Sequence, residues 1–210
     1  MRQTGSCTTL LDRFAADPKP RGLAIRAAAV VFVTALTAAA AQMSVPVPFT
    51  DVPFTFQPTV VLLGGLALGS RLGMGSQLLY LIAGLAGMPV FAASATLPPG
   101  ALRLLGPTGG YLMAYPAAAF AAGYLAERGF DRRYESSVVA MLAGLLIIYA
   151  CGVTWLGLFA FLGTQSAPIG LRAALAAGLY PFVVADAVKL LVAAGILPAF
   201  WRLIGRPDTG

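Results

Sequence analysis

Two oppositely charged side chains stand in an apolar run near the C-terminus. Asp186 and Lys189 are the only charged residues of the stretch 182–199, and their spacing of three places them on one helical face. Inserting either side chain at the centre of a membrane helix would cost roughly 2.5 to 3.5 kcal/mol of free energy. Such residues therefore normally face the interior of the bundle and mark a substrate or ion path. We interpret the pair as part of a binding site. The alternatives are a structural ion pair, or a Lys189 that reaches the membrane interface.

A basic residue, Arg103, precedes a glycine-rich junction. Its planar guanidinium suits a carboxylate, and the alternative is a solvated loop charge. The residues that follow, 104–111, read LLGPTGGY. Thr108 is a plausible N-cap, and the glycines allow exposed backbone amides at a helix start, a place that favours anions. An anionic group of a ligand is therefore expected to bind here.

A proline-rich segment, 44–58, carries aromatic, hydroxyl and amide side chains. Its four prolines forbid a continuous helix and favour extended backbone. Thr50, Phe54 and Gln57 combine apolar surface with hydrogen-bonding groups, as small-molecule sites require, and Tyr111 is expected to line the same cavity. The alternative is that the aromatic rings anchor the loop among lipid headgroups.

The residue types exclude most enzymatic and metal chemistry. The chain has no histidine, the commonest proton-transfer residue and transition-metal ligand. Cys7 and Cys151 give neither a disulfide framework nor a metal spacing. No Gly-Lys-Ser or Gly-Lys-Thr follows the glycines, so there is no Walker A loop for ATP. We expect no catalytic residue, no metal, no cofactor and no enzyme.

The composition predicts that membrane helices position these side chains. Of 210 residues, 59% are hydrophobic and only 10% are charged, and the mean hydropathy is +0.82. Because a span needs about 20 apolar residues, the chain predicts an all-α membrane protein, a single domain over 1–210. Residues 1–22 are expected to be disordered or to lie on the surface, and 199–210 to form a tail. About six spans are predicted, near 23–43, 59–70, 73–90, 109–126, 138–162 and 180–197, the last ending at Pro198.

Small residues recur every four positions in several of these spans. This spacing lets membrane helices approach closely, so we expect packing inside the bundle; partner docking is the alternative for the first span. The residues are Ala35 and Ala39, then Gly65, Gly69 and Gly73, then Ala114, Ala118 and Ala122.

The basic residues predict the orientation of the spans. All but three of the fourteen lie in the terminal segments, at Arg71 or in the charged break 127–137. The positive-inside tendency therefore places both termini in the cytoplasm and the structured loops 44–58 and 91–108 outside. Such clustering is a topology signal and argues against a nucleic-acid partner.

Taken in order, these motifs resemble the BioY family. The resemblance runs from about the first span to the last and leaves out only the tails. It departs at Asp51, where the family pattern has proline. The matching runs are VPVPFT at 45–50, VPFT at 52–55 with Gln57, GMPVF at 87–91, LGPTGGY at 105–111, and Asp186 with Lys189.

The resemblance implies the S component of an energy-coupling factor (ECF) transporter in the bacterial inner membrane. In this class one membrane subunit captures a vitamin, here biotin, and a second membrane protein with two ATPase subunits drives its release inward. The resemblance implies that Arg103 or Lys189 holds the biotin carboxylate. Asp186 would accept from the ureido N–H groups, and the outer loop with Tyr111 would cover the apolar part. Homo-oligomer formation is left open.

The main alternative is an ion-coupled secondary transporter of a small carboxylate-bearing molecule, with Asp186 as a proton or sodium site. Such folds often show inverted repeats and two matching broken helices, and the sequence shows neither convincingly. An intramembrane protease would need a nucleophile and a base. Without histidine only a Ser–Lys pair or carboxylates remain, so this class is disfavoured.

Overall fold

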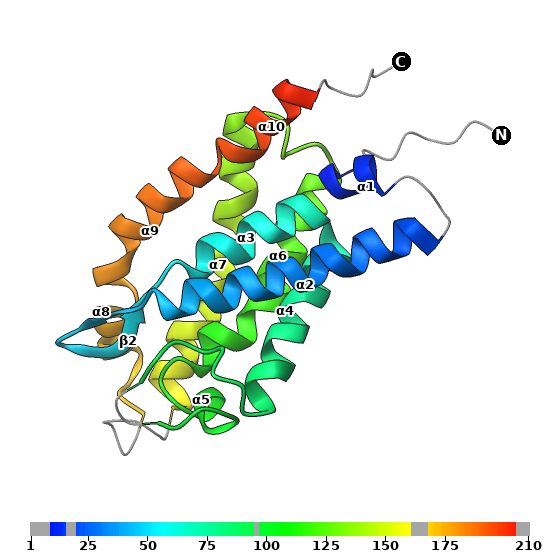
Figure 1. The fold of residues 1–210 in the computed structure, drawn as a ribbon. Helices are drawn as coiled ribbons and strands as arrows, with labels where there is room; N and C mark the ends of the chain where they lie inside the picture. The colour runs from blue at the N-terminus through cyan, green and yellow to red at the C-terminus, as the bar shows by residue number, and fades with distance from the viewer. Residues whose placement is uncertain (1–8, 16–19, 95–96, 161–167, 205–210) are drawn as a thin grey trace.

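The chain folds into a mostly helical bundle with one β-hairpin at its end (Figure 1). The computed structural model describes residues 9–15, 20–94, 97–160 and 168–204. The hairpin, α5 and α8 lie at one end of the bundle, and α1 and α10 lie at the other. The elements are α1 (Leu10–Phe14), α2 (Pro20–Gln42), β1 (Val45–Val47), β2 (Thr50–Phe54), α3 (Gln57–Leu68), α4 (Ser70–Leu85), α5 (Leu102–Leu105), α6 (Gly109–Ala126), α7 (Tyr134–Leu158), α8 (Leu171–Gly178), α9 (Tyr180–Ala193) and α10 (Ile196–Ile204).

Within the part of the chain that the structure describes, three helical stretches are long and apolar enough to cross a membrane: Arg21–Gln42, Tyr134–Leu158 and Tyr180–Ile204. Helix α3 is apolar but shorter. Large apolar side chains cover the outside, as Val184 and Val192 of α9 do with more than 70% of their surface exposed. Such a surface is stable in lipid, where helices satisfy their own backbone groups. The protein is thus a multi-pass membrane protein.

Helix α6 lies at the centre, packed against α3, α4 and α7. Glycines allow this packing, because a Cβ on Gly65 of α3 would lie 2.4 Å from the backbone oxygen of Ala119 in α6. Gly69 has a positive φ of 84° and forms the sharp junction between α3 and α4. The predicted inward packing is confirmed for these glycines and for the alanines of α6, Ala114, Ala118 and Ala122.

The same prediction is wrong for the first span. Ala35 and Ala39 are exposed, because α2 turns Val33, Thr37 and Ala40 inward. Thr37 accepts a hydrogen bond from Gln77 of α4, so a polar contact fixes the rotation of α2.

Several predicted helix ends are also wrong, and α7, predicted to run to 162, ends at Leu158. The last span continues past Pro198 to Ile204, after a break at Ala194 and Gly195. Pro198 lies in the first turn of α10, where its missing N–H is not needed. Helix α4, predicted as the third span, ends at Leu85, because Gly87 adopts a φ of 89° and the N–H of Met88 caps the carbonyl of Ala83.

The described part of the N-terminal segment is folded, so of the two alternatives predicted for it, disorder or a place on the surface, disorder is wrong for residues 9–15. Thr9 and Asp12 form a capping box at the start of α1. Leu11 and Ala15 are buried, and Asp12 pairs with Arg26 of α2 at 3.0 Å. Residues 1–8 and 16–19 lie outside the described residues.

The proline-rich segment is extended over residues 45–54, as predicted, and forms an antiparallel hairpin there, whereas Gln57 and Pro58 already belong to α3. Val45 pairs with Phe54, and Val47 pairs with Thr50. Asp51, at the position where the family pattern has proline, lies within β2, so the hairpin forms with it.

Candidate functional site

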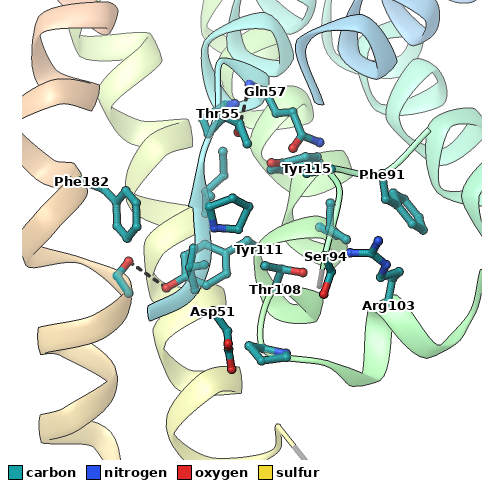
Figure 2. Close-up of a pocket in the computed structure, with 18 of the residues that line it drawn as sticks. Asp51, Thr55, Gln57, Phe91, Ser94, Arg103, Thr108, Tyr111, Tyr115 and Phe182 are labelled. Atoms are coloured by element: carbon teal, nitrogen blue, oxygen red, sulfur yellow. Dashed lines mark hydrogen bonds between the residues drawn. The ribbon is translucent and has the colours of Figure 1, made fainter. Parts of the chain in front are cut away.

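A cavity opens at the end of the bundle that carries the hairpin, α5 and α8. Its empty volume is about 880 Å³, which includes space that is open to solvent. Figure 2 shows that β2, α5, α6 and α9 surround it. Its lining comprises Asp51, Val52, Pro53, Thr55, Gln57, Pro58, Phe91, Ala92, Ala93, Ser94, Leu97, Arg103, Pro107, Thr108, Tyr111, Leu112, Tyr115, Ile148, Tyr149, Gly178, Phe182 and Asp186.

One wall carries a buried carboxylate, Asp186 of α9, which is 8% exposed. The Tyr149 hydroxyl of α7 donates to its Oδ2 at 2.6 Å. Lys189, one turn further along α9, pairs with its Oδ1. A carboxylate with a cation on one oxygen and a hydroxyl on the other is held in a fixed orientation. The free lone pairs of both oxygens remain hydrogen-bond acceptors for a ligand.

Lys189 contacts the protein on several sides. Its Nζ donates to the Thr55 carbonyl at 2.7 Å and lies 3.9 Å from the ring centroid of Phe54. Thr55 follows β2 directly, so this bond joins the hairpin to α9.

The far wall carries the guanidinium of Arg103. In Figure 2, Arg103 from α5 lies on the opposite side of the cavity from Phe182, which precedes Asp186 by one helical turn. Arg103 is 8% exposed, so the alternative of a solvated loop charge is wrong. Its Nε donates to the Pro98 carbonyl at 3.1 Å. Burial lowers the pKa of the guanidinium, which nevertheless stays charged at neutral pH.

The third wall is a chain of hydrogen-bonded and stacked side chains. The Gln57 amide donates to the Tyr80 hydroxyl at 2.7 Å, and this hydroxyl donates to the Val90 carbonyl at 3.1 Å. The ring of Phe91 packs edge-on against Tyr80 at 5.4 Å between centroids. The loop after α4 is thereby attached to α3 and α4.

Tyr111 crosses the cavity and is held by glycines on two helices. Its hydroxyl donates to the Gly178 carbonyl at 2.8 Å. A Cβ on Gly178 would lie 2.1 Å from that hydroxyl oxygen, and one on Gly152 would lie 2.2 Å from the ring. Both positions must lack a side chain for Tyr111 to keep this orientation.

A Gly178→Ala variant is therefore expected to displace Tyr111 and to weaken ligand binding about tenfold, equivalent to about 1.4 kcal/mol. Gly75→Ala is the matched control, because a Cβ there meets nothing within 4 Å. Ligand titration of both purified variants tests this. Equal affinities in the two variants would show that the position of Tyr111 does not matter.

Of the predicted site residues, Asp186, Arg103, Tyr111 and Gln57 line the cavity. The other three do not belong to its lining. The Thr50 hydroxyl accepts from the N–H of Val52 at 3.1 Å and borders a separate depression beside the tip of the hairpin. Phe54 packs against the Lys189 ammonium, behind the cavity wall.

The hydrogen bond from Tyr149 to Asp186 was not predicted from the sequence. A buried tyrosine hydroxyl usually finds a partner, but the partner lies 37 residues away in the chain. Thr108 lies at the predicted N-cap position of α6 but makes no side-chain capping bond, and its side chain faces the cavity instead (Figure 2).

No group of three or more acidic, cysteine or histidine side chains that could hold a metal ion occurs among residues 9–15, 20–94, 97–160 and 168–204. The polar groups of the cavity are instead two carboxylates, Asp51 and Asp186, with a guanidinium, hydroxyls and an amide. This set suits an organic ligand with both hydrogen-bond donors and an anionic group.

Comparison with known proteins shows which family the chain belongs to. The BioY family profile matches residues 13–206. The probable biotin transporter BioY of Pyrococcus horikoshii is 42% identical over 164 residues, 78% of this chain and 88% of that protein. The biotin transporter BioY of Thermotoga maritima is 38% identical over 161 residues, 77% of this chain and 86% of that protein. Both relatives are named as transporters, not as enzymes.

A solved structure shares the fold. The crystal structure of the S-component for biotin from an ECF-type ABC transporter aligns with a TM-score of 0.74 and 24% identity, covering 89% of this chain and 95% of that one. The family profile covers most of this chain, and the two relatives are 42% and 38% identical to it. This chain belongs to the BioY family.

Proposed function

We propose that this chain captures biotin on the outer side of a bacterial inner membrane, as the S component of an ECF-type transporter. The observation that carries the proposal is the cavity itself, with a fixed carboxylate on one wall and a buried guanidinium on the other. Biotin has ureido N–H donors at one end, a carboxylate at the other, and an apolar bicycle and chain between them. The N–H donors of biotin thus match the carboxylate of the cavity, and the carboxylate of biotin matches the guanidinium.

In this arrangement Asp186 accepts from the ureido N–H groups and Arg103 binds the biotin carboxylate. Hydrogen bonds with an ionised partner are about twice as strong as neutral ones, and both groups are pre-oriented by the protein. Tyr111, Phe91 and Phe182 supply apolar surface between the two ends. Lys189, Phe54 and Thr50 support the hairpin and are not assigned a direct contact.

The topology proposed for this function has six spans in a single membrane domain, formed by α2, α3, α4, α6, α7 and the pair α9 and α10. Helix α3 has 12 residues and is about 18 Å long, so neighbouring helices must cover its ends. Exposed arginines support a cytoplasmic placement of the end that holds α1 and α10, because basic residues favour that side. These arginines are Arg21, Arg71, Arg128, Arg133 and Arg202.

Transport would need energy from other subunits, because the sequence carries no nucleotide-binding motif. A membrane coupling subunit and two ATPase subunits are the proposed partners, and no cofactor is proposed for this chain. Uptake of radiolabelled biotin by cells that lack their own biotin transporter tests the proposal. Uptake should require functional ATPase subunits. Uptake that persists without them but stops when the ion gradient collapses would instead support the ion-coupled alternative.

Arg103→Gln is expected to weaken biotin binding roughly 10- to 150-fold, because a hydrogen bond to a charged group contributes about 1.5 to 3 kcal/mol. Arg172→Gln is the matched control, since Arg172 is exposed on α8 at the same end of the bundle. Isothermal titration of both purified variants measures the effect. An equal loss in the two variants would reject a specific role for Arg103.

A further inference from the structure

The Lys189 ammonium has its binding directions occupied by the protein. The side chain is 10% exposed. Its Nζ pairs with Asp186 in the same helix, donates to the Thr55 carbonyl at 2.7 Å and faces the Phe54 ring at 3.9 Å. An ammonium has three N–H donors, and two oxygens and an aromatic face account for them. Little of this charge is available to a ligand carboxylate.

The position of Lys189 relative to the cavity also indicates that its ammonium binds the protein and not a ligand. Its two oxygen partners, Asp186 and Thr55, both line the cavity, whereas Lys189 is not part of the lining. The ammonium therefore lies behind the wall that these two residues form, and it links them.

The linked elements are the hairpin and the last span. A two-stranded hairpin is at best marginally stable alone, so the position of residues 45–54 over the cavity depends on contacts with the rest of the protein. The Thr55 hydroxyl accepts from the N–H of Gln57 at 3.3 Å, which turns the backbone into α3. The Thr55 carbonyl is left pointing at α9, where Lys189 binds it.

We propose that Lys189 is a positioning residue that latches the hairpin to α9, and that it does not bind the carboxylate of the ligand. The proposal rests on the function proposed above and deepens it, because it leaves Arg103 as the carboxylate-binding group. One cation thus fixes both the acceptor Asp186 and the cover of the site.

Hydrogen exchange in the biotin-free protein tests the latch without any ligand. Lys189→Met retains the length of the side chain and removes its charge. It is expected to speed amide exchange in residues 45–56 by about tenfold or more, since local opening becomes easier. Arg103→Gln should leave this exchange unchanged. Unchanged exchange in a folded Lys189→Met protein would overturn the proposal.

Two ligands distinguish a latch from a carboxylate-binding residue. Biotin and its neutral carboxamide differ only at the end that Arg103 is proposed to bind. Lys189→Met should weaken both ligands by the same factor, whereas Arg103→Gln should weaken biotin and spare the amide. If Lys189→Met weakens biotin selectively, Lys189 binds the carboxylate and the proposal is wrong.

A second variant covers the case in which Lys189→Met does not fold, since it leaves Asp186 without its cation. Phe54→Leu keeps the ion pair and removes the aromatic face. It is expected to speed exchange of the hairpin in the same direction, by a smaller factor. The matched control is Phe49→Leu, at an exposed ring in the turn of the same hairpin. Equal exchange in these two variants would overturn the latch.

The two proposals fail in different ways. If the wild-type protein binds no biotin, the proposed function is wrong, while the exchange of the ligand-free hairpin still decides the role of Lys189. If biotin binds but the exchange does not respond to Lys189 or Phe54, only the latch is rejected.

Discussion

Asp186→Asn is expected to weaken biotin binding by about 30-fold to several thousandfold, because truncating one partner of a buried charge pair costs roughly 2 to 5 kcal/mol. The change removes the anionic acceptor for the ureido group. It also leaves Lys189 buried without a counterion, and the new amide cannot accept on both sides. Equilibrium binding of labelled biotin to the purified variant measures the loss.

Asp12→Asn is the matched control for this experiment. Asp12 also pairs with a basic residue, Arg26, but its side chain is 37% exposed and lies in α1, at the other end of the bundle. Its replacement should leave biotin affinity unchanged. If Asp186→Asn binds as tightly as Asp12→Asn, the acceptor has been assigned to the wrong residue.

Gly65→Ala is expected to lower the stability of the bundle by about 1 to 3 kcal/mol, the usual cost of overpacking. The added Cβ would lie 2.4 Å from the Ala119 carbonyl oxygen, so α3 and α6 must separate. Because α6 contributes Tyr111 and Tyr115 to the cavity, biotin binding should fall as well. Thermal unfolding in detergent measures the first effect.

Gly75→Ala makes the same chemical change in α4, at a position where a Cβ meets nothing within 4 Å. There the alanine should stabilise the protein by about 0.5 to 1 kcal/mol, because glycine loses more backbone entropy in a helix. The two variants should thus shift the melting temperature in opposite directions. A shift in the same direction would show that close contact between α3 and α6 does not stabilise the bundle.

The long apolar helices, such as α2 and α7, could be predicted because apolar runs have few other stable folds. The helix ends could not, since they depend on local capping and on tertiary contacts. Pro198 was expected to stop the last span, but a proline is also tolerated in a first turn. There the indole N–H of Trp201, which is fully buried, donates to Asp131 at 2.6 Å and docks α10.

Residues of the candidate site could be predicted where their type has a high free-energy cost in its surroundings, as a charge has in an apolar segment. Asp186 could be predicted because a charged residue in an apolar run is energetically costly and usually functional. Arg103 could be predicted because it precedes a helix start, which favours anions. The roles of Tyr149 and Lys189 were not predictable. Their partners lie 37 and 134 residues away in the chain, and only the folded bundle brings them together.

Direct titration of the purified wild-type chain with biotin, in the absence of any partner subunit, tests the central claim. We expect saturable binding of one biotin per chain with a Kd below about 1 μM, equivalent to more than about 8 kcal/mol. Octanoate, which has a carboxylate and an apolar chain but no ureido group, should not displace it. The absence of saturable biotin binding by the folded protein would contradict the account.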